Sequence, residues 1–338
     1  MIGQVVIIAI GLLFSSILNA SPSIEQQMEM LQEAEDYLTV KPSQSLRILA
    51  LSSDVEKLPL GLQIRWHVLR VRASVPTNQL MLLEQSLKAL FAFSAHPYFE
   101  DKLPSILSAL GIWLRRKGHL QEADISLQCA LQYAQNESQR LTLINSRALV
   151  ARHMGKYPDA ISLYQEAALL AQQQHNASMM ATINNNLGAI ALDLANYDEA
   201  DVYFRAALAG YQRIDKRSGH ITAGTNLLFL FLLKGEMLNY QRLYSPIKAL
   251  TDGFPNQSKK ALLTWINTAH LVKQGGHISG QARQNLQVAY TQLESHQVKL
   301  LVVTHLVPIV QVTLPALPTR KSTPFLAPWF KKVQDCRW

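Results

Sequence analysis

The sequence predicts an all-α fold, a right-handed solenoid of helix-turn-helix repeats with about 12 to 14 helices and a short irregular or β-prone C-terminal tail. Two stretches of 21 residues, one from Leu110 and one from Leu187, place small and large apolar residues in the same order. Weaker copies between and after them keep this register, and the alternation that indicates strands is nearly absent before residue 298. Because one helix pair cannot bury its own apolar face, several must stack.

The stretch from Leu187 to Ala207 is the clearest copy, and its pattern indicates two amphipathic helices joined at Ala195-Asn196. Small residues let the two helices approach closely, and large ones fill the space beside them. The small positions are Gly188, Ala191 and Ala200, and the large ones are Tyr197 and Phe204. The turn residues of successive copies, Gly118, Gly155, Ala195 and Gly235, are 37, 40 and 40 residues apart, and a fifth copy is expected around Trp265 to Ala289.

This pattern resembles the tetratricopeptide repeat (TPR), whose consensus places Leu-Gly, Gly, Tyr, Ala, Phe and Ala in that order. The resemblance covers about residues 104–293. The long repeats and the run NNNLGAI at 184–190 are similar to exported TPR sensory arrays of bacterial signalling proteins, and also to arrays in bacterial transcription regulators. Those arrays accompany a signalling or DNA-binding domain, for which this sequence leaves no room after the array, so signal output is not expected from the same chain.

We expect four regions along the chain. They are a signal peptide at 1–20, degenerate N-terminal repeats that cap the array at 21–97, the TPR array at 98–297, and an apolar then basic C-terminal tail at 298–338. The capping repeats are expected as helices at 24–40, 43–51, 60–73 and 78–93, with Ser43 as the N-cap of the second. Terminal units of a solenoid commonly depart from the repeat consensus.

The first twenty residues predict export. They contain no charged side chain, and an apolar run from Val5 to Phe14 precedes small residues, which is typical of a secretory signal peptide cleaved before Ser21. The basic residue usual in the leading region is missing, and retention as a membrane anchor is the alternative. The prediction is a periplasmic or secreted protein. Cys129 and Cys336 make no disulfide framework, and we expect Cys129 to be an unpaired, buried helix residue, with a bridge to the tail as the alternative.

Residues 300–318, LLVVTHLVPIVQVTLPALP, are long and apolar enough to suggest a membrane span, and the basic Arg320 and Lys321 follow them. His305, Gln311 and three prolines argue against a span, because prolines leave backbone groups unsatisfied in lipid. We therefore expect an extended or β-prone segment that packs on the last repeat and covers its apolar end. The membrane anchor is the alternative.

No motif predicts catalysis, a cofactor or a metal site. The sequence has no glycine-rich phosphate loop, no HExxH, no paired-cysteine metal spacing and no GxSxG, and no two histidines stand at helical ligand spacing. The net charge of +8 favours acidic partners, and the basic tail is a candidate for contact with a membrane surface. Export makes a nucleic-acid partner unexpected, and no feature indicates the oligomeric state.

In the TPR family the concave groove is lined by the first helix of each unit, which implies a lining for this chain. The candidate partner-binding residues are Arg115, Asn145, Leu149, Arg152, Asn185, Leu192, Phe229 and Leu232, beside neighbouring positions such as Ser105, Ser108, Ile112 and Thr142. The asparagines would hold a peptide backbone, the arginines a carboxylate, and the leucine and phenylalanine side chains apolar groups. The lysines of the family's carboxylate clamp are not matched. The alternatives are that the asparagines join helices, the arginines are solvated and the apolar stripe is core.

These observations predict a non-enzymatic, exported TPR protein that binds a protein or peptide partner in its groove, as an envelope scaffold or sensor component. The first alternative is a membrane-anchored receptor ectodomain with a span at 300–318. The second is an envelope hydrolase or the activator of one.

Overall fold

The computed structural model describes residues 23–52, 54–317 and 325–338. The expected signal peptide at 1–20 and the basic residues Arg320 and Lys321 therefore lie outside the described residues. Within the described part the chain is helical and contains no strand, which confirms the all-α prediction.

Among the described residues, fourteen helices of eight or more residues form seven successive hairpins, which agrees with the expected number of helices. The pairs are α1 (Ile24–Val40) with α2 (Pro42–Leu49), α3 (Leu60–Ser74) with α4 (Leu80–Ala92), α6 (Leu103–Lys117) with α7 (Leu120–Gln132), α8 (Glu137–His153) with α9 (Tyr157–Gln173), α10 (Ala177–Asp193) with α11 (Tyr197–Arg213), α12 (Arg217–Lys234) with α13 (Met237–Asp252), and α14 (Gln257–Lys273) with α15 (Gly280–Gln292). Shorter elements are η1 (Val55–Lys57), α5 (Pro97–Asp101), α16 (His296–Leu301), η2 (Val302–Leu306), α17 (Val307–Val310) and α18 (Phe330–Asp335).

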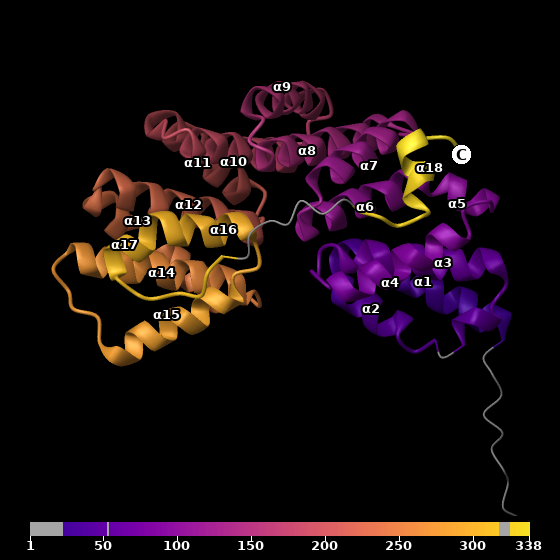
Figure 1. The fold of residues 1–338 in the computed structure, drawn as a ribbon, viewed down its shortest axis with the longest axis horizontal. Helices are drawn as coiled ribbons and strands as arrows, with labels where there is room; N and C mark the ends of the chain where they lie inside the picture. Colours follow the sequence, from indigo (N-terminus) through magenta and orange to yellow (C-terminus); the bar gives the residue numbers. More distant parts are fainter. Residues whose placement is uncertain (1–22, 53, 318–324) are drawn as a thin grey trace, which may run out of the picture.

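The hairpins stack into an arch (Figure 1). The first helices of successive pairs contact one another from α1 to α14, so they form a continuous layer. We call α1 to α7 the N-terminal arm, α8 to α11 the bridge, and α12 to α17 the C-terminal arm. In Figure 1 the bridge joins the two arms at the top, and α18, from the end of the chain, lies on the N-terminal arm.

The close approach of helices predicted around Gly188 is confirmed. A Cβ atom built on Gly188 would lie 2.8 Å from the ring of Phe204, so only glycine fits between α10 and α11 without movement. Ala200 and Phe204 are completely buried beside it. The turn residues Gly118, Gly155 and Gly235 have φ angles of 94°, 76° and 76°, in the left-handed region that favours glycine.

The capping repeats form helices close to the predicted ranges, with one correction. Ser43 is not the N-cap of the second helix, because α2 begins one residue earlier, at Pro42, with Lys41 as its N-cap. Proline is favoured in the first turn of a helix, since its missing N–H has no intrahelical partner there. The preceding helix α1 begins behind Ser23, which forms a capping box with Gln26.

The prediction of an extended or β-prone segment after residue 298 is wrong for the chain up to Val310, which is helical. Val302, Leu306 and Val310 recur every four residues, so a helix places them on one side, and all three are buried. They pack in the same apolar core as α12 and α14, so this part covers the end of the solenoid, as expected. Among the described residues, no helix has both the length and the apolar character needed to cross a membrane.

Candidate functional site

The first helices of the N-terminal arm and the bridge border a cavity of about 300 Å³. It lies between α3, α6 and α8, and four predicted groove positions line it: Ser105, Ser108, Ile112 and Thr142. The remaining wall is made by Arg72, Val75, Pro104, Ala109, Ser138, Gln139 and Leu143. The cavity thus combines aliphatic walls with four hydroxyl groups, a lining suited to an extended chain that presents both apolar side chains and backbone amides.

A second, smaller cavity of about 200 Å³ adjoins the first and shares Arg72, Pro104, Ser105 and Gln139 with it. Its charged groups are paired: Glu35 lies 2.9 Å from the guanidinium of Arg65 and 3.5 Å from that of Arg72. The pairing leaves this end of the groove polar but nearly neutral.

Arg115, predicted to bind a carboxylate, lines a large cavity of about 1170 Å³ between the two arms. Arg116 and Lys117 from the same turn and Glu294 from the C-terminal arm also line it. Burial and, to a smaller extent, the nearby charge of Arg116 lower the pKa of Arg115 to about 10, so the side chain stays charged at neutral pH. Within the described residues no carboxylate pairs with the Arg115 guanidinium, which leaves it facing a cavity large enough for several residues of a ligand.

The two predicted asparagines join neighbouring helices. The Asn145 Oδ1 accepts a hydrogen bond from Asn186 Nδ2 at 3.5 Å, and the Asn185 Oδ1 accepts one from Asn226 Nδ2 at 2.9 Å. The repeat spacing of 41 residues thus places an amide pair between successive first helices. This geometry fits the alternative interpretation, in which the asparagines satisfy contacts between helices.

Arg152 is also engaged within the protein. Its Nε donates to Asp193 Oδ2 at 2.8 Å and its terminal nitrogen to Asp193 Oδ1 at 3.1 Å, a bidentate pair between α8 and the end of α10. The predicted apolar positions Leu149 and Leu192 are half-buried on the same two helices. Of the two predicted arginines, Arg115 alone is placed to meet an anionic ligand.

The predicted apolar end of the groove is covered by the chain itself. Phe229 and Leu232 on α12 are 2% and 0% exposed, because the tail packs over this part of the first-helix layer. The ring of His305 in the tail meets the ring of Phe229 edge to face, with centroids 5.7 Å apart. These two residues therefore belong to the core and present no surface to a ligand.

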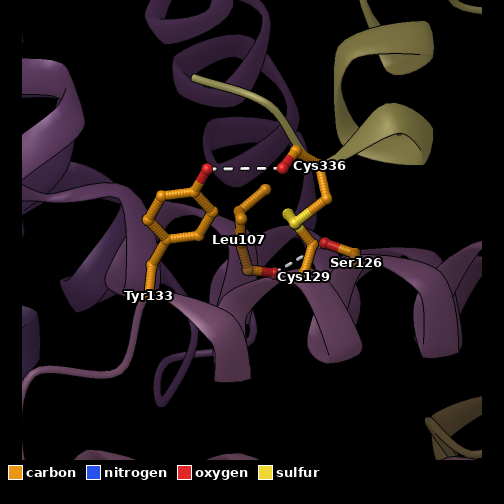
Figure 2. Close-up of a disulfide and its surroundings, with 5 residues drawn as sticks. All are labelled: Leu107, Ser126, Cys129, Tyr133 and Cys336. Atoms are coloured by element: carbon orange, nitrogen blue, oxygen red, sulfur yellow. Dashed lines mark hydrogen bonds between the residues drawn. A yellow bond between two sulfur atoms is a disulfide. The ribbon is translucent and has the colours of Figure 1, made fainter.

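Cys129 and Cys336 form a disulfide, and the expectation of an unpaired Cys129 is wrong (Figure 2). Cys129 is buried in α7, as predicted, but α18 brings Cys336 to a Cα–Cα distance of 5.5 Å from it. The hydroxyl of Tyr133 donates to the backbone oxygen of Cys336 at 3.3 Å in the same place. A bridge to the tail was the alternative stated from the sequence, and the aromatic residues near Cys336, Trp329, Phe330 and Trp338, are a signal that could have favoured it.

A family match and one superposition with a TM-score above 0.5 agree with the fold. A family model described as tetratricopeptide repeat matches residues 139–213. Aspartyl phosphate phosphatase F from Bacillus subtilis superposes with a TM-score of 0.57 at 13% identity, over 94% of this chain and 96% of that one. BtubC (BKLC) from P. vanneervenii matches with a TM-score of 0.46 at 19% identity, over 74% of this chain and 98% of that one. No curated protein sequence gives a significant match.

A Rap protein complexed with competence and sporulation factor matches with a TM-score of 0.44 at 14% identity, over 86% of this chain and 98% of that one. The matched residues 139–213 cover α8 from Gln139 onward and the whole of α9 to α11. The stacked hairpins, the glycine contact at Gly188 and the family match over residues 139–213 together show that the chain contains tetratricopeptide repeats.

Proposed function

We propose that the chain is an exported, non-enzymatic protein that binds a protein or peptide partner in its concave groove, as an envelope scaffold or a sensor component. The observation that carries the proposal is the difference between the two halves of the first-helix layer. The tail covers the half on α12 and α14, whereas the half on α3, α6 and α8 keeps a cavity lined by Ser105, Ser108 and Ile112.

The open half offers the contacts that an extended peptide needs. The hydroxyls of Ser105, Ser108 and Thr142 can hydrogen-bond to a peptide backbone, and Ile112 supplies apolar contact. Arg115, farther along α6, supplies a charged guanidinium for an acidic side chain or a terminal carboxylate. A ligand that runs along α6 would meet both chemistries in turn.

The disulfide supports the exported location. Such bonds form and persist in oxidising compartments and are rare in the cytosol of most organisms. Cys129 and Cys336 are the only cysteines of the chain, so export would leave no free thiol in the mature protein. Cleavage before Ser21 would give a mature N-terminus two residues ahead of the Ser23 cap of α1.

The groove is tested by filling it. Ser108→Phe places a large side chain in the cavity of about 300 Å³, and Ser162→Phe makes the same change at an exposed position of α9. Tagged protein of each kind is crosslinked in the cells that produce it, and the recovered partners are identified by mass spectrometry. We expect one partner to be lost with Ser108→Phe and kept with Ser162→Phe. If both variants recover the same proteins, the groove is not the binding site.

A further inference from the structure

Three aromatic side chains of the N-terminal arm form a cleft that receives the end of the chain. Phe91 of α4, Phe99 of α5 and Trp113 of α6, with α7 beside them, make up what we call the aromatic cleft. Residues 325–338, which we call the C-terminal segment, lie in it. Neither the three aromatic residues of the cleft nor the C-terminal segment lines the cavity of about 300 Å³ between α3, α6 and α8, so the aromatic cleft is a separate surface.

The C-terminal segment enters the cleft through aromatic and aliphatic anchors. Trp329 stacks on Phe91 with ring centroids 4.1 Å apart and an angle of 12° between the planes. Phe330 and Val333 are 2% and 0% exposed, and the ring of Trp338 lies 5.3 Å from that of Phe99. Val333 lies about one helical turn after both Phe330, the first residue of α18, and Trp329, its N-cap, which is the spacing of a helix that binds in a groove.

Polar contacts add little to this binding. The backbone N–H of Phe325 donates to Glu122 at 3.2 Å, and Lys332 Nζ donates to Ser94 at 3.2 Å, both at the partly open edge of the cleft. The indole nitrogen of Trp338 is buried without a hydrogen-bond partner, which opposes docking.

The segment is poorly suited to hold itself in place. Its helix has six residues, too few for an isolated helix to be stable, and ordering fourteen residues opposes the gain from the anchors. Leu326 is 83% exposed and contributes nothing to that gain. The disulfide to Cys129 removes most of this entropic disadvantage, because it keeps the segment beside the cleft at all times.

We propose that the aromatic cleft is a binding site for an amphipathic helical peptide with aromatic anchors, and that the redox state of the Cys129–Cys336 disulfide decides whether it is open. In the oxidised chain the C-terminal segment occupies the site. In the reduced chain the segment can leave the aromatic cleft, and a partner peptide with the same spacing of aromatic anchors binds in its place.

The opening step needs a dithiol. One of its thiolates attacks Sγ of Cys336, which is half-buried, whereas Cys129 is 2% exposed. The bond between the two cysteine sulfurs breaks and a mixed disulfide forms. The second thiol of the reductant then attacks that mixed disulfide, so that the reductant becomes an internal disulfide and its two hydrogens end on Cys129 and Cys336.

The test uses the full chain and a labelled synthetic peptide of residues 325–338 that carries Cys336→Ser. Fluorescence anisotropy is measured with the oxidised chain and with the chain reduced by dithiothreitol. We expect binding to be at least tenfold tighter after reduction, and to be lost when the peptide also carries Trp329→Ala and Phe330→Ala. The altered peptide is the matched control, since it leaves the protein unchanged.

A second variant removes competition from the attached segment. The full chain with Trp329→Ala and Phe330→Ala should bind the unaltered peptide more tightly than the reduced natural chain does. Hydrogen exchange should show faster exchange of residues 325–338 after reduction, with protection of α8 to α11 kept. If neither chain binds the peptide while that protection is kept, or if protection of α4 to α7 is lost with the disulfide, the proposal fails and the disulfide only stabilises the arm.

Discussion

Each of the two arms binds one part of the C-terminal tail, and the two contacts differ in place and in kind. On the C-terminal arm, His296–Val310 lies on the first-helix layer and is held by the aliphatic side chains of Val302, Leu306 and Val310. On the N-terminal arm, the C-terminal segment lies against α7 and is held by aromatic stacking and a disulfide. Only the first of these contacts covers the groove.

This difference indicates where a partner has room to bind. The last helices of a solenoid expose an apolar surface that another segment must cover. Here the tail covers it on α12 and α14, and it thereby fills the first-helix layer at that end. The N-terminal arm is capped by its own degenerate repeats, so its part of the first-helix layer keeps the cavity around Ser108. The groove that we propose is therefore one-sided. Four changes that test this division follow, from the largest expected effect to the smallest.

Removal of the disulfide should have the largest effect. Closure of a loop that spans 207 residues is worth about 5 kcal/mol in the chain-entropy model, so Cys129→Ala with Cys336→Ser should lower the free energy of unfolding by up to that amount. Urea unfolding followed by tryptophan fluorescence reports mainly on the N-terminal arm, where four of the five tryptophans lie, among them Trp113 and Trp338. A loss under 1 kcal/mol would mean that the C-terminal segment constrains the unfolded chain very little.

Shortening one buried side chain of His296–Val310 should lower the free energy of unfolding by less than removal of the disulfide does. Leu306 is fully buried against α14, and Leu306→Ala should lower the free energy of unfolding by about 3 kcal/mol. The same change at Leu300, which is 48% exposed on the preceding turn, serves as the control and should have an effect below about 1 kcal/mol. Equal losses in the two variants would show that the tail is not packed as described.

The repeats could be predicted from the sequence because their contacts are local and periodic. Gly188 meets Phe204 sixteen residues later, and Gly111 meets Leu127 at the same spacing, so the repeat register predicts the turns and the first-helix layer of the array. Ser105, Ser108 and Ile112, which the same register places on the first-helix layer, line the cavity of about 300 Å³.

The rest of the site depends on contacts that no period reveals. Cys336 lies 207 residues from Cys129, and nothing in the repeat register connects α7 with the end of the chain. The burial of Phe229, which was predicted to face the groove, depends in the same way on a distant residue, His305 of the tail. Arg152 was predicted as a ligand because its partner, Asp193, stands one repeat away on the next first helix.

The helix contact in the bridge should be sensitive to a single methyl group. Gly188→Ala would place its Cβ 2.8 Å from the Phe204 ring, and overpacking of this kind typically costs about 1 to 3 kcal/mol. Gly61→Ala in α3 is the control, because its Cβ meets no atom within 4 Å and alanine is the better helix former. Thermal unfolding should therefore move in opposite directions for the two variants, and a shift in the same direction would refute the close approach.

The smallest effect is a pH dependence that belongs to the N-terminal arm. Burial lowers the pKa of His67 to about 4, and the charge of Arg70 contributes to this shift. Between pH 6.5 and 4 the unfolded chain therefore binds more protons at this histidine than the folded chain, so stability falls as the pH falls through this window. The stability of the natural chain relative to His67→Gln should drop by about 1 kcal/mol from pH 7 to pH 5, after allowance for solvent screening. His277→Gln, at an exposed position of the C-terminal arm, provides the reference measurement, and identical pH profiles for the two variants would contradict the assignment.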